Sequence, residues 1–406
     1  MHHKTFAFKT SLTTTCLALA LFGSGLTQQA EASQDTASFG IDSALLDVHN
    51  RCIVRLSDDL PKADVVGRAK GLLARANAMT RGNAALKHVY QHSIKGFTIG
   101  MPCAQAQRAF GHDAMVQSLT PDSIVHMNPR PPGKGPGGGG GDGGGETPDP
   151  QTTPWGISRV GGPVPGAGYT AWVIDTGIDL DHPDLVVDGG RGFSAFTKGK
   201  NAGVDDGQGH GTHVAGTIAA LDNNRDVVGV AAGATVIPVK VLDARGSGST
   251  SGVIAGVDHV ANNAAPGDCA NMSLGGGVSQ ILDDAVIAAA AQSGAYFVLA
   301  AGNDGNDANG HSPARANGPN VFTISASDSN DLMASFSNFG NPPVDYAAPG
   351  VGVLSTKKGG GTVSYSGTSM AAPHACAVLM LTGGNPATDG VISGDPDGTP
   401  DSIIAL

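Results

Sequence analysis

The chain has 406 residues, of which 40% are apolar and 15% are charged. This length and composition suit a globular protein with more than one domain, and they exclude an intrinsically disordered chain. Its 35 acidic residues outnumber its 24 basic ones, which gives a net charge of −11. No basic stripe interrupts this acidic balance, so we expect no nucleic-acid partner.

Residues 1–32 have the pattern of a secretory signal. Lys4 and Lys9 precede an apolar run over residues 17–22, and small residues follow up to Ala32. A short core helix or a membrane anchor is the alternative, but the run is too brief to span a bilayer. We therefore predict cleavage after Ala32 and a secreted protein, extracellular or periplasmic, without a membrane anchor.

A stretch rich in glycine and proline divides the rest of the chain. Residues 129–150 read PRPPGKGPGGGGGDGGGETPDP, a composition that cannot bury enough apolar surface to form a core. Residues 33–128 carry 10 Lys and Arg against 8 Asp and Glu, whereas residues 129–406 carry 12 against 26. The sequence therefore predicts a small domain over 33–128, a linker over 129–150 and a larger acidic domain over 151–406.

The small domain has the element order of a split βαβ fold, which makes it an α+β, ferredoxin-like domain. Its apolar periodicity predicts strand, helix, strand, strand, helix and strand at 51–56, 63–79, 86–90, 96–100, 104–110 and 123–126. No nucleophile, acid pair or metal spacing occurs among these elements. We therefore expect no chemistry in this domain.

The large domain alternates short apolar runs with helical patterns. Strands are predicted at 171–174, 236–242, 272–274, 297–299 and 321–324, and helices at 210–221, 252–262 and 282–292. Such alternation favours an α/β fold in which helices cover both faces of a parallel sheet. Functional sites in such sheets gather at the carboxyl ends of the strands.

The five cysteines leave the disulfide pattern open. Cys16 lies in the predicted signal, and export permits disulfides in the remainder. Cys52 with Cys103 and Cys269 with Cys376 are candidate pairs. Buried free thiols are an equal alternative for the second pair, because both of its cysteines lie in apolar surroundings.

Four polar residues stand where predicted strands end or helices begin. Asp175 ends AWVID, His210 opens a helix in GHGTHVAGTIAA, Asn303 follows the strand in YFVLAAGN, and Ser369 opens a helix in GTSMAAPHACAVLML, with Pro373 in its first turn. A histidine can take the proton of a serine nucleophile, a buried carboxylate can orient that histidine, and an amide can stabilise an oxyanion. The pattern therefore indicates acyl transfer.

Each of these residues also has a structural interpretation. Asp175 could serve a turn and Ser369 could cap a helix. His210 and His213 are spaced like metal ligands, but no third ligand completes a zinc site. Asp179 is the nearest competitor for the orienting carboxylate, although it lies beyond the strand. The occurrence of all four residues together, in this order, favours the catalytic interpretation. It leaves a structural role for His213.

Five motifs, VIDTGID, GHGTHVAGT, NMSLGGG, AAGNDG and SGTSMAAPH, resemble those of the subtilase family of serine endopeptidases, in the same order. The resemblance covers 151 to 381, and HSPARANGPNVFTISASD with ASFSNFG is similar to the proteinase K branch. It implies a subtilisin-like fold in which Asp175 orients His210, the general base. In the same comparison Ser369 is the nucleophile and Asn303 is the oxyanion donor.

The resemblance also implies a cleft that clamps an extended polypeptide substrate between two strands, as in β-augmentation. The residues that match these strands are Ser273, Leu274, Gly275, Gly246, Ser247 and Gly248. Contacts through the backbone imply broad specificity. They count against an esterase, as does the missing G-x-S-x-G motif at Ser369. A catalytically silent subtilase fold that acts as a binding module is the second alternative.

His311 stands where the proteinase K branch has a tyrosine near the primary specificity pocket, with a solvated loop histidine as an equal interpretation.

A calcium site is a further implication of the resemblance. The loop LDNNRDV, residues 221–227, has the length of the subtilisin loop that holds a tight calcium ion. The implied ligands are the side chains of Gln151, Asp184 and Asn223 and the carbonyls of Leu221, Arg225 and Val227. Such an all-oxygen set suits a structural calcium ion, and a polar turn without an ion is the alternative.

Residues 51–128 resemble the inhibitory propeptide of subtilases, most clearly at SIKGFTIGM and SIVHMN. The resemblance implies a monomeric zymogen whose tail, residues 124–128, lies in its own substrate cleft as an inhibitor. We predict self-cleavage near Asn128 or, alternatively, beyond the linker. After Leu381 the chain departs from the family, and we expect the helix that begins at Ser369 to stop there and a loop to follow.

Overall fold

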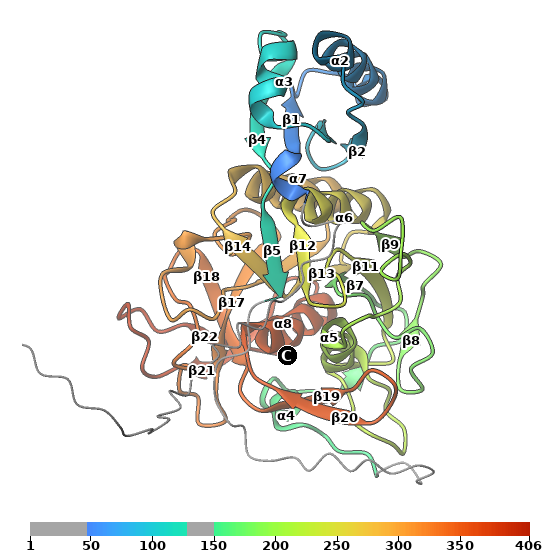
Figure 1. Ribbon diagram of the computed structural model, residues 1–406. Coiled ribbons are helices and arrows are strands. Elements are labelled where there is room, and N and C mark those ends of the chain that lie inside the picture. Colours follow the sequence, from blue (N-terminus) through green and yellow to red (C-terminus); the bar gives the residue numbers. More distant parts are fainter. Residues whose placement is uncertain (1–46, 128–149) are drawn as a thin grey trace, which may run out of the picture. The chain divides into compact units, whose positions relative to one another are not determined.

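The computed structural model describes residues 47–127 and 150–406 (Figure 1). The predicted signal over 1–32 and the predicted cleavage residue Asn128 lie outside these ranges, as does the linker apart from Pro150. All described residues belong to the compact unit Ile41–Leu406. The predicted end of the signal at residue 32 and the predicted limits of the linker therefore stay predictions.

A mostly parallel sheet of ten strands forms the centre of the large domain. Its order is β21-β22-β18-β17-β15-β13-β7-β11-β8, with β9 beside β11. All neighbouring strands in the series from β22 to β8 pair in parallel, as do β9 and β11, whereas β21 runs antiparallel to β22. The strands are β7 (Thr170–Asp175), β8 (Val186–Val187), β9 (Phe193–Ser194), β11 (Thr235–Lys240), β13 (Cys269–Met272), β15 (Tyr296–Ala300), β17 (Val321–Ser327), β18 (Val344–Pro349), β21 (Ala387–Val391) and β22 (Ser402–Ala405).

Helices cover both faces of this sheet (Figure 1). Helices α5 (His210–Ala219) and α8 (Thr368–Thr382) lie on one face, and α6 (Thr250–Asn263) and α7 (Gln280–Ser293) lie on the other. Strand β7 serves both cores, because successive side chains of a strand point to opposite faces. Val173 packs with α5 and α8, while Trp172 and Ile174 pack with α6 and α7. The predicted α/β fold is confirmed.

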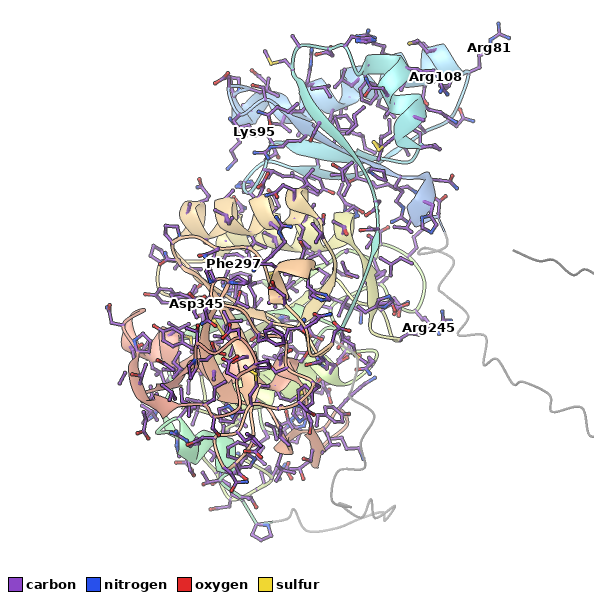
Figure 2. The ribbon with its side chains drawn as sticks, turned by 90° about the vertical axis from the view of Figure 1, so that its left-hand side faces the viewer. Arg81, Lys95, Arg108, Arg245, Phe297 and Asp345 are labelled. Carbon is purple, nitrogen blue, oxygen red and sulfur yellow. A yellow bond between two sulfur atoms is a disulfide. The ribbon has the colours of Figure 1, made fainter. Side chains whose placement is uncertain are left out.

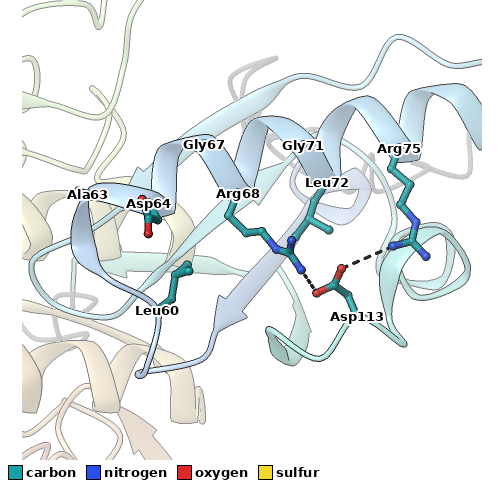
Figure 3. Close-up of a pocket in the computed structure, with 9 residues that line it drawn as sticks. All are labelled: Leu60, Ala63, Asp64, Gly67, Arg68, Gly71, Leu72, Arg75 and Asp113. Atoms are coloured by element: carbon teal, nitrogen blue, oxygen red, sulfur yellow. Dashed lines mark hydrogen bonds and ion pairs between the residues drawn. The ribbon is translucent and has the colours of Figure 1, made fainter.

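The small domain has its own sheet, with the order β2-β3-β1-β4. Its elements are β1 (Cys52–Leu56), α2 (Val65–Thr80), β2 (Leu86–Tyr90), β3 (Gly96–Ile99), α3 (Cys103–Phe110) and β4 (Val116–Pro121). Arg68 and Arg75 of α2 both form ion pairs with Asp113, beside a hollow of 610 Å³ that the helix lines (Figure 3). Arg81, Lys95 and Arg108 project from this domain (Figure 2), in keeping with its slightly basic balance.

The predicted last strand of the small domain forms, but it lies outside the sheet of that domain. Residues 123–126 fall in β5 (Ile124–Met127), which pairs with β12 (Ser247–Ser249) and β14 (Leu274–Gly277) of the large domain. The fourth strand of the small sheet is β4, which the sequence did not predict. Its residues VQSLTP are exposed or half-buried throughout, so they lack the apolar alternation that predicts a strand.

The expected loop after Leu381 is also wrong. Helix α8 ends at Thr382, close to its predicted end, but β21 and β22 follow and extend the central sheet. Ile403 is fully buried and pairs with Ala347 of β18. The glycine, proline and aspartate residues around these strands conceal them, and their pairing depends on a strand more than fifty positions away in the sequence.

Shorter elements complete the described chain: η1 (Val48–Asn50), η2 (Lys62–Asp64), α4 (Trp155–Arg159), β6 (Val164–Pro165), β10 (Ala231–Ala232), η3 (Ala308–Gly310), β16 (His311–Ser312), β19 (Val353–Thr356) and β20 (Thr362–Tyr365). Across 47–127 and 150–406, no helix combines the length and the apolar character that crossing a bilayer requires.

Two disulfides join distant elements. Cys52 bonds to Cys103, which ties β1 to α3, and Cys269 bonds to Cys376, which ties β13 to α8. Both are among the candidate pairs, and the second excludes the alternative of free thiols. Cys269 and Cys376 are fully buried. Their disulfide attaches the helix that carries Ser369 to the central sheet.

Candidate active site

Four elements bring the predicted catalytic residues to the carboxyl edge of the sheet. Asp175 is the last residue of β7, and Asn303 follows the end of β15. His210 is the first residue of α5, and Ser369 is the second residue of α8. Carboxyl ends of parallel strands meet at one edge, which is where sites form in α/β folds.

His210 and Asp175 form a direct contact. His210 Nδ1 lies 2.8 Å from Asp175 Oδ1 and 2.9 Å from Oδ2, and the aspartate is fully buried. Gly211 permits this approach, since a Cβ there would lie 2.1 Å from Gly177 O and 3.2 Å from Asp175 Cβ. The carboxylate holds Nδ1 of the ring, which leaves Nε2 directed away from Asp175.

Two hydrogen bonds join Ser369 and Ser273. Its Oγ donates to Ser273 O at 3.2 Å, and Ser273 Oγ donates to Ser369 O at 2.8 Å. The second contact has a cause in the helix. Pro373 stands four residues after Ser369, in the second turn of α8 rather than the predicted first turn, and it has no N–H for the Ser369 carbonyl. Ser273 supplies the missing donor.

Two nitrogen atoms, Asn303 Nδ2 and Ser369 N, lie beside one small space at Gly367. Thr368 donates to Asn303 Oδ1 through its N–H at 2.8 Å and its hydroxyl at 3.0 Å, which turns Asn303 Nδ2 to the other side. A Cβ on Gly367 would lie 3.1 Å from that Nδ2 and 3.7 Å from Ser369 N. Glycine therefore leaves room, between a side-chain amide and the N-terminus of α8, where an oxyanion would be stabilised.

The predicted substrate strands enclose the tail of the small domain. Strand β5 runs antiparallel to both β12 and β14, with His126 opposite Ser247 on one side and opposite Gly275 on the other. Gly246 O accepts a hydrogen bond from Met127 N at 2.8 Å. Gly246 has φ +74°, and a Cβ there would lie 2.6 Å from Met127 Sδ, so the close approach requires glycine.

The remaining predicted cleft residues adjoin this strand pair. Gly248 is opposite Val125, and Leu274 is opposite Met127. Ser273 separates β13 from β14, which the sequence predicted as one strand over 272–274.

His311 lies on the strand next to β14. It is opposite Gly277 in the β14–β16 pair, and its Nε2 lies 2.8 Å from Asn306 Oδ1. Its Nδ1 is 3.7 Å from the carboxylate of Asp304, the residue that follows Asn303. His311 thus has polar partners in the loop after β15.

The predicted calcium ligands lie in one small region. Gln151 Nε2 donates to Leu221 O at 2.8 Å and to Val227 O at 3.4 Å. Asn223 Nδ2 donates to Asp184 Oδ1 at 2.7 Å, and Asn223 Oδ1 accepts from Arg225 N at 2.8 Å.

Asp184 is the exceptional member of this group. It is fully buried, and its Oδ2 has no hydrogen-bond partner. Burial raises the pKa of Asp184 to about 6. A buried carboxylate oxygen without a hydrogen-bond partner is a group that a cation would satisfy.

The two competitors from the sequence have other partners. Asp179 Oδ2 accepts a hydrogen bond from Gly359 N at 2.7 Å. His213 is stacked on Tyr365 with ring centroids 4.6 Å apart, and its Nε2 lies 3.1 Å from Val353 O. Burial, together with the charge of His210, lowers the pKa of His213 to about 3, so this ring stays neutral. Among the residues that the structure describes, no three or more His, Cys, Asp or Glu side chains are grouped to hold a metal ion.

Three buried residues that contact the surroundings of the His210–Asp175 pair were not predicted from the sequence. Asp206 accepts hydrogen bonds from the start of α5, Thr176 follows Asp175, and Lys240 ends β11. Two signals could have found them. An aspartate stands four residues before the helix that His210 opens, and a single lysine ends the otherwise apolar run VIPVK.

A histidine–carboxylate pair, a serine that opens a helix and an asparagine amide, all at the carboxyl edge of one sheet, are the groups that a serine peptidase requires. Residues 166–387 match the sequence profile of the Subtilase family. The subtilisin-like serine protease AsES of Sarocladium strictum is 37% identical over 349 residues, which are 78% of this chain and 81% of that protein. Alkaline serine exoprotease A of Vibrio alginolyticus is 40% identical over 308 residues, 73% of this chain and 53% of that protein.

A solved structure gives the same result. The crystal structure of a cold adapted subtilisin-like serine proteinase shares 39% identity at a TM-score of 0.54, over 62% of this chain and 97% of that one. The chain therefore belongs to the subtilase family and is a subtilisin-like serine endopeptidase.

Proposed function

We propose that the chain is a secreted zymogen of a broad-specificity endopeptidase, in which Ser369, His210 and Asp175 form the catalytic triad and Asn303 is the oxyanion donor. One observation carries the proposal above the others. The bidentate contact of His210 Nδ1 with Asp175 stands at the same sheet edge as the two N–H groups over Gly367.

The chemistry follows from these positions. As Ser369 Oγ attacks a substrate carbonyl carbon, its proton passes to His210 Nε2, and the imidazolium is stabilised by Asp175. The carbonyl oxygen takes the negative charge and is bound by Asn303 Nδ2 and Ser369 N. His210 then gives its proton to the leaving amine, which leaves an acyl-enzyme. Water repeats the sequence, with His210 again taking and returning one proton.

The test of this proposal is the loss of one hydroxyl. Purified mature enzyme should hydrolyse a generic protein substrate and be inactivated by an acylating serine reagent, and Ser369→Ala should abolish hydrolysis. Ser366→Ala is the matched control, because Ser366 is three residues away and its Oγ accepts a hydrogen bond from Gly352 N at 2.9 Å. A silent binding module would give no hydrolysis in the parent, and full activity in Ser369→Ala would refute the triad.

The zymogen part of the proposal is supported by the tail that fills the cleft. Besides β5, the small domain contacts α6, where Asp258 accepts hydrogen bonds from Gln91 N at 3.0 Å, His92 N at 2.7 Å and Ser93 N at 2.7 Å. Because backbone pairing on both sides of β5 imitates a bound peptide, the tail acts as an inhibitor.

Maturation then separates the two domains. We expect N-terminal sequencing of the mature enzyme to place the cut near Asn128 or beyond the linker, and Ser369→Ala to remain uncut. An active enzyme with an intact connection would refute the zymogen proposal. Two disulfides in the described residues accord with the oxidising compartment that secretion implies.

A structural calcium ion completes the proposal. Half-turns of the Gln151 and Asn223 amides would present oxygen in place of NH2, so that these side chains, Asp184 and the carbonyls of residues 221, 225 and 227 could surround the ion. An ion bound only by the folded state raises the melting temperature by mass action. A chelator should therefore lower the melting temperature of mature enzyme, and calcium should restore it.

Asp184→Asn supplies the control for the ion. The variant should melt at a temperature that no longer responds to calcium. An unchanged melting temperature of the parent after chelation would remove the ion from the proposal.

We also propose that His311 lies near the primary specificity pocket. Its place beside β14, and its partners in the loop that follows Asn303, support this assignment. His311→Tyr should change the cleavage preference across a peptide library. Preference identical to that of the parent would contradict the assignment.

A further inference from the structure

A second buried network lies behind the proposed acid–base pair. Its centre is Asp206, which is fully buried four residues before His210. Its Oδ1 accepts hydrogen bonds from Thr176 Oγ1, Gln208 N and Gly209 N, each at 2.8 Å. Its Oδ2 accepts from Thr212 N at 3.0 Å and from Thr212 Oγ1 at 2.6 Å. One carboxylate thus binds the loop before α5, the first turn of α5 and the residue after Asp175.

Thr176 is the bridge between the two halves of the acid–base pair. Its N–H donates to Asp175 Oδ1 at 2.7 Å. Its hydroxyl donates to Asp206 and accepts from Gly211 N at 2.9 Å, in the residue directly after His210. A single hydroxyl therefore connects the carboxylate that orients the imidazole with the backbone that carries the imidazole.

Lys240 is the third residue of the network. It is 1% exposed, and its Nζ donates to Thr176 O at 2.6 Å and to Asp205 O at 2.9 Å. Lys240 is also the register partner of Asp175 between β11 and β7. Its ammonium group supplies a positive charge next to the buried Asp206, which reduces the cost of burying that carboxylate.

We infer that Asp206, Thr176 and Lys240 are positioning residues that set the geometry of His210 against Asp175. The inference rests on the proposed triad. None of the three residues belongs to β12 or β14, the strands that flank the peptide in the cleft. Their contacts instead fix β7 against the first turn of α5. The network therefore acts on kcat through the alignment of the base, and it leaves peptide binding unaffected.

The decisive comparison removes the bridging hydroxyl and then returns it. Thr176→Val keeps the volume of the side chain and deletes both of its hydrogen bonds, whereas Thr176→Ser keeps the hydroxyl. We expect kcat of mature Thr176→Val to fall by about 10- to 100-fold with KM within about threefold of the parent, because a small misplacement of a catalytic group has that effect. Thr176→Ser should recover most of kcat.

The pH profile gives a readout that a packing defect would not move. A looser Asp175 contact stabilises the imidazolium less, so the acid limb of kcat/KM should move to lower pH in Thr176→Val. Thr217→Val is the matched control. Thr217 is also buried on α5, but its hydroxyl donates within its own helix, to His213 O at 3.3 Å.

Two results would overturn the inference. One is an unchanged kcat in Thr176→Val, and the other is an equal loss in Thr176→Ser, which would assign the effect to packing. Titration with the acylating reagent counts competent sites in each sample. If the parent resists that reagent, the proposed function fails. If the parent reacts and Thr176→Val keeps its kcat, only the positioning role fails.

A second pair of variants, at Thr212, provides the test if Thr176→Val does not mature. Thr212→Val deletes the hydrogen bond that the hydroxyl donates to Asp206 Oδ2 and the one that it accepts from Asp179 N, and Thr212→Ser retains both. If Thr176→Val yields no processed enzyme, Thr212→Val should lower kcat at least threefold relative to Thr212→Ser. Equal kcat in the two would overturn the inference.

Discussion

At the scale of single residues, the direction of the Asn303 amide depends on Thr368. An amide side chain can present either oxygen or NH2 to a ligand, and two donations from Thr368 to Oδ1 select between them. Thr368 in turn accepts from Gly302 N at 3.1 Å through its hydroxyl. The loop after β15 and the start of α8 are therefore oriented together.

Asn303→Ala tests the proposed role of Asn303 as oxyanion donor. Because the amide acts on charge that develops only in the transition state, we expect kcat to fall by about 10²- to 10³-fold while KM changes little, a magnitude that comes from the same change in subtilisin. The measurement is kcat and KM on a peptide substrate. Asn309→Ala is the control, since Asn309 is exposed in the same loop. A rise in KM at constant kcat would instead assign Asn303 to substrate binding.

The proposed catalytic residues stand out in the sequence because the chemistry requires particular residue types, and because each follows a strand or opens a helix. Their supports do not. Ser273 and Thr368 are ordinary hydroxyl residues, and their value depends on partners 96 and 65 positions away, respectively. Only the fold brings these partners within hydrogen-bond distance.

At the scale of elements, the small domain is held by a bond between its central strand and its second helix. Strand β1 pairs with both β3 and β4, and Cys52 at its start bonds to Cys103 at the start of α3. The two cysteines are 51 positions apart. A loop of this length restricts the unfolded chain strongly, so the disulfide stabilises this domain by about 4 kcal/mol.

Replacing both cysteines tests that contribution. In the full-length chain with Ser369→Ala, Cys52→Ala with Cys103→Ala should lower the free energy of unfolding of the small domain by about 2 to 4 kcal/mol. Pulse proteolysis at increasing urea concentration, followed by detection of the small domain, measures the change. A midpoint equal to that of the Ser369→Ala parent would show that the disulfide does not stabilise the domain.

Elements were predictable where they bury a continuous apolar run and unpredictable where pairing alone defines them. Strands β7, β11 and β15 lie between two helix layers and carry such runs. In contrast, β18 reads VDYAAP and places Asp345 on an exposed position, and β4 has no buried residue. These strands form because a neighbour offers hydrogen bonds, and the neighbour is distant in the chain.

At the scale of the whole molecule, the last residues of the chain are anchored in the central sheet through a buried carboxyl group. Asp401 is 1% exposed just before β22, and it accepts hydrogen bonds from Ser325 of β17 and from Asn341 Nδ2, the latter at 2.9 Å. Burial raises the pKa of Asp401 from 3.8 to about 6. The folded protein therefore favours the protonated form of this group.

The sign of the pH effect follows from this shift. The pKa of Asp401 is higher in the folded state, so its contribution to stability is complete below about pH 4 and is lost as the pH rises through about 6. Above that range the folded protein must bury a charge.

Asp401→Asn removes the charge and keeps the shape. The amide oxygen can still accept from Asn341, and its NH2 can donate to Ser325 Oγ, which then acts as acceptor. We expect the variant to have a free energy of unfolding about 1 to 3 kcal/mol higher than the parent at pH 8, since one pKa unit corresponds to about 1.4 kcal/mol. Below about pH 4 the difference should vanish.

Urea titrations between pH 4 and pH 8 measure this difference, in a Ser369→Ala background that prevents self-digestion. Asp59→Asn is the control, because Asp59 is exposed and belongs to the small domain rather than to the sheet that β22 joins. Its stability should follow the parent at every pH. Parallel pH dependences for Asp401→Asn and the parent would mean that the carboxyl group titrates alike in the folded and unfolded chains. In that case the attachment of β22 to β18 and β17 would owe its pH dependence to another group.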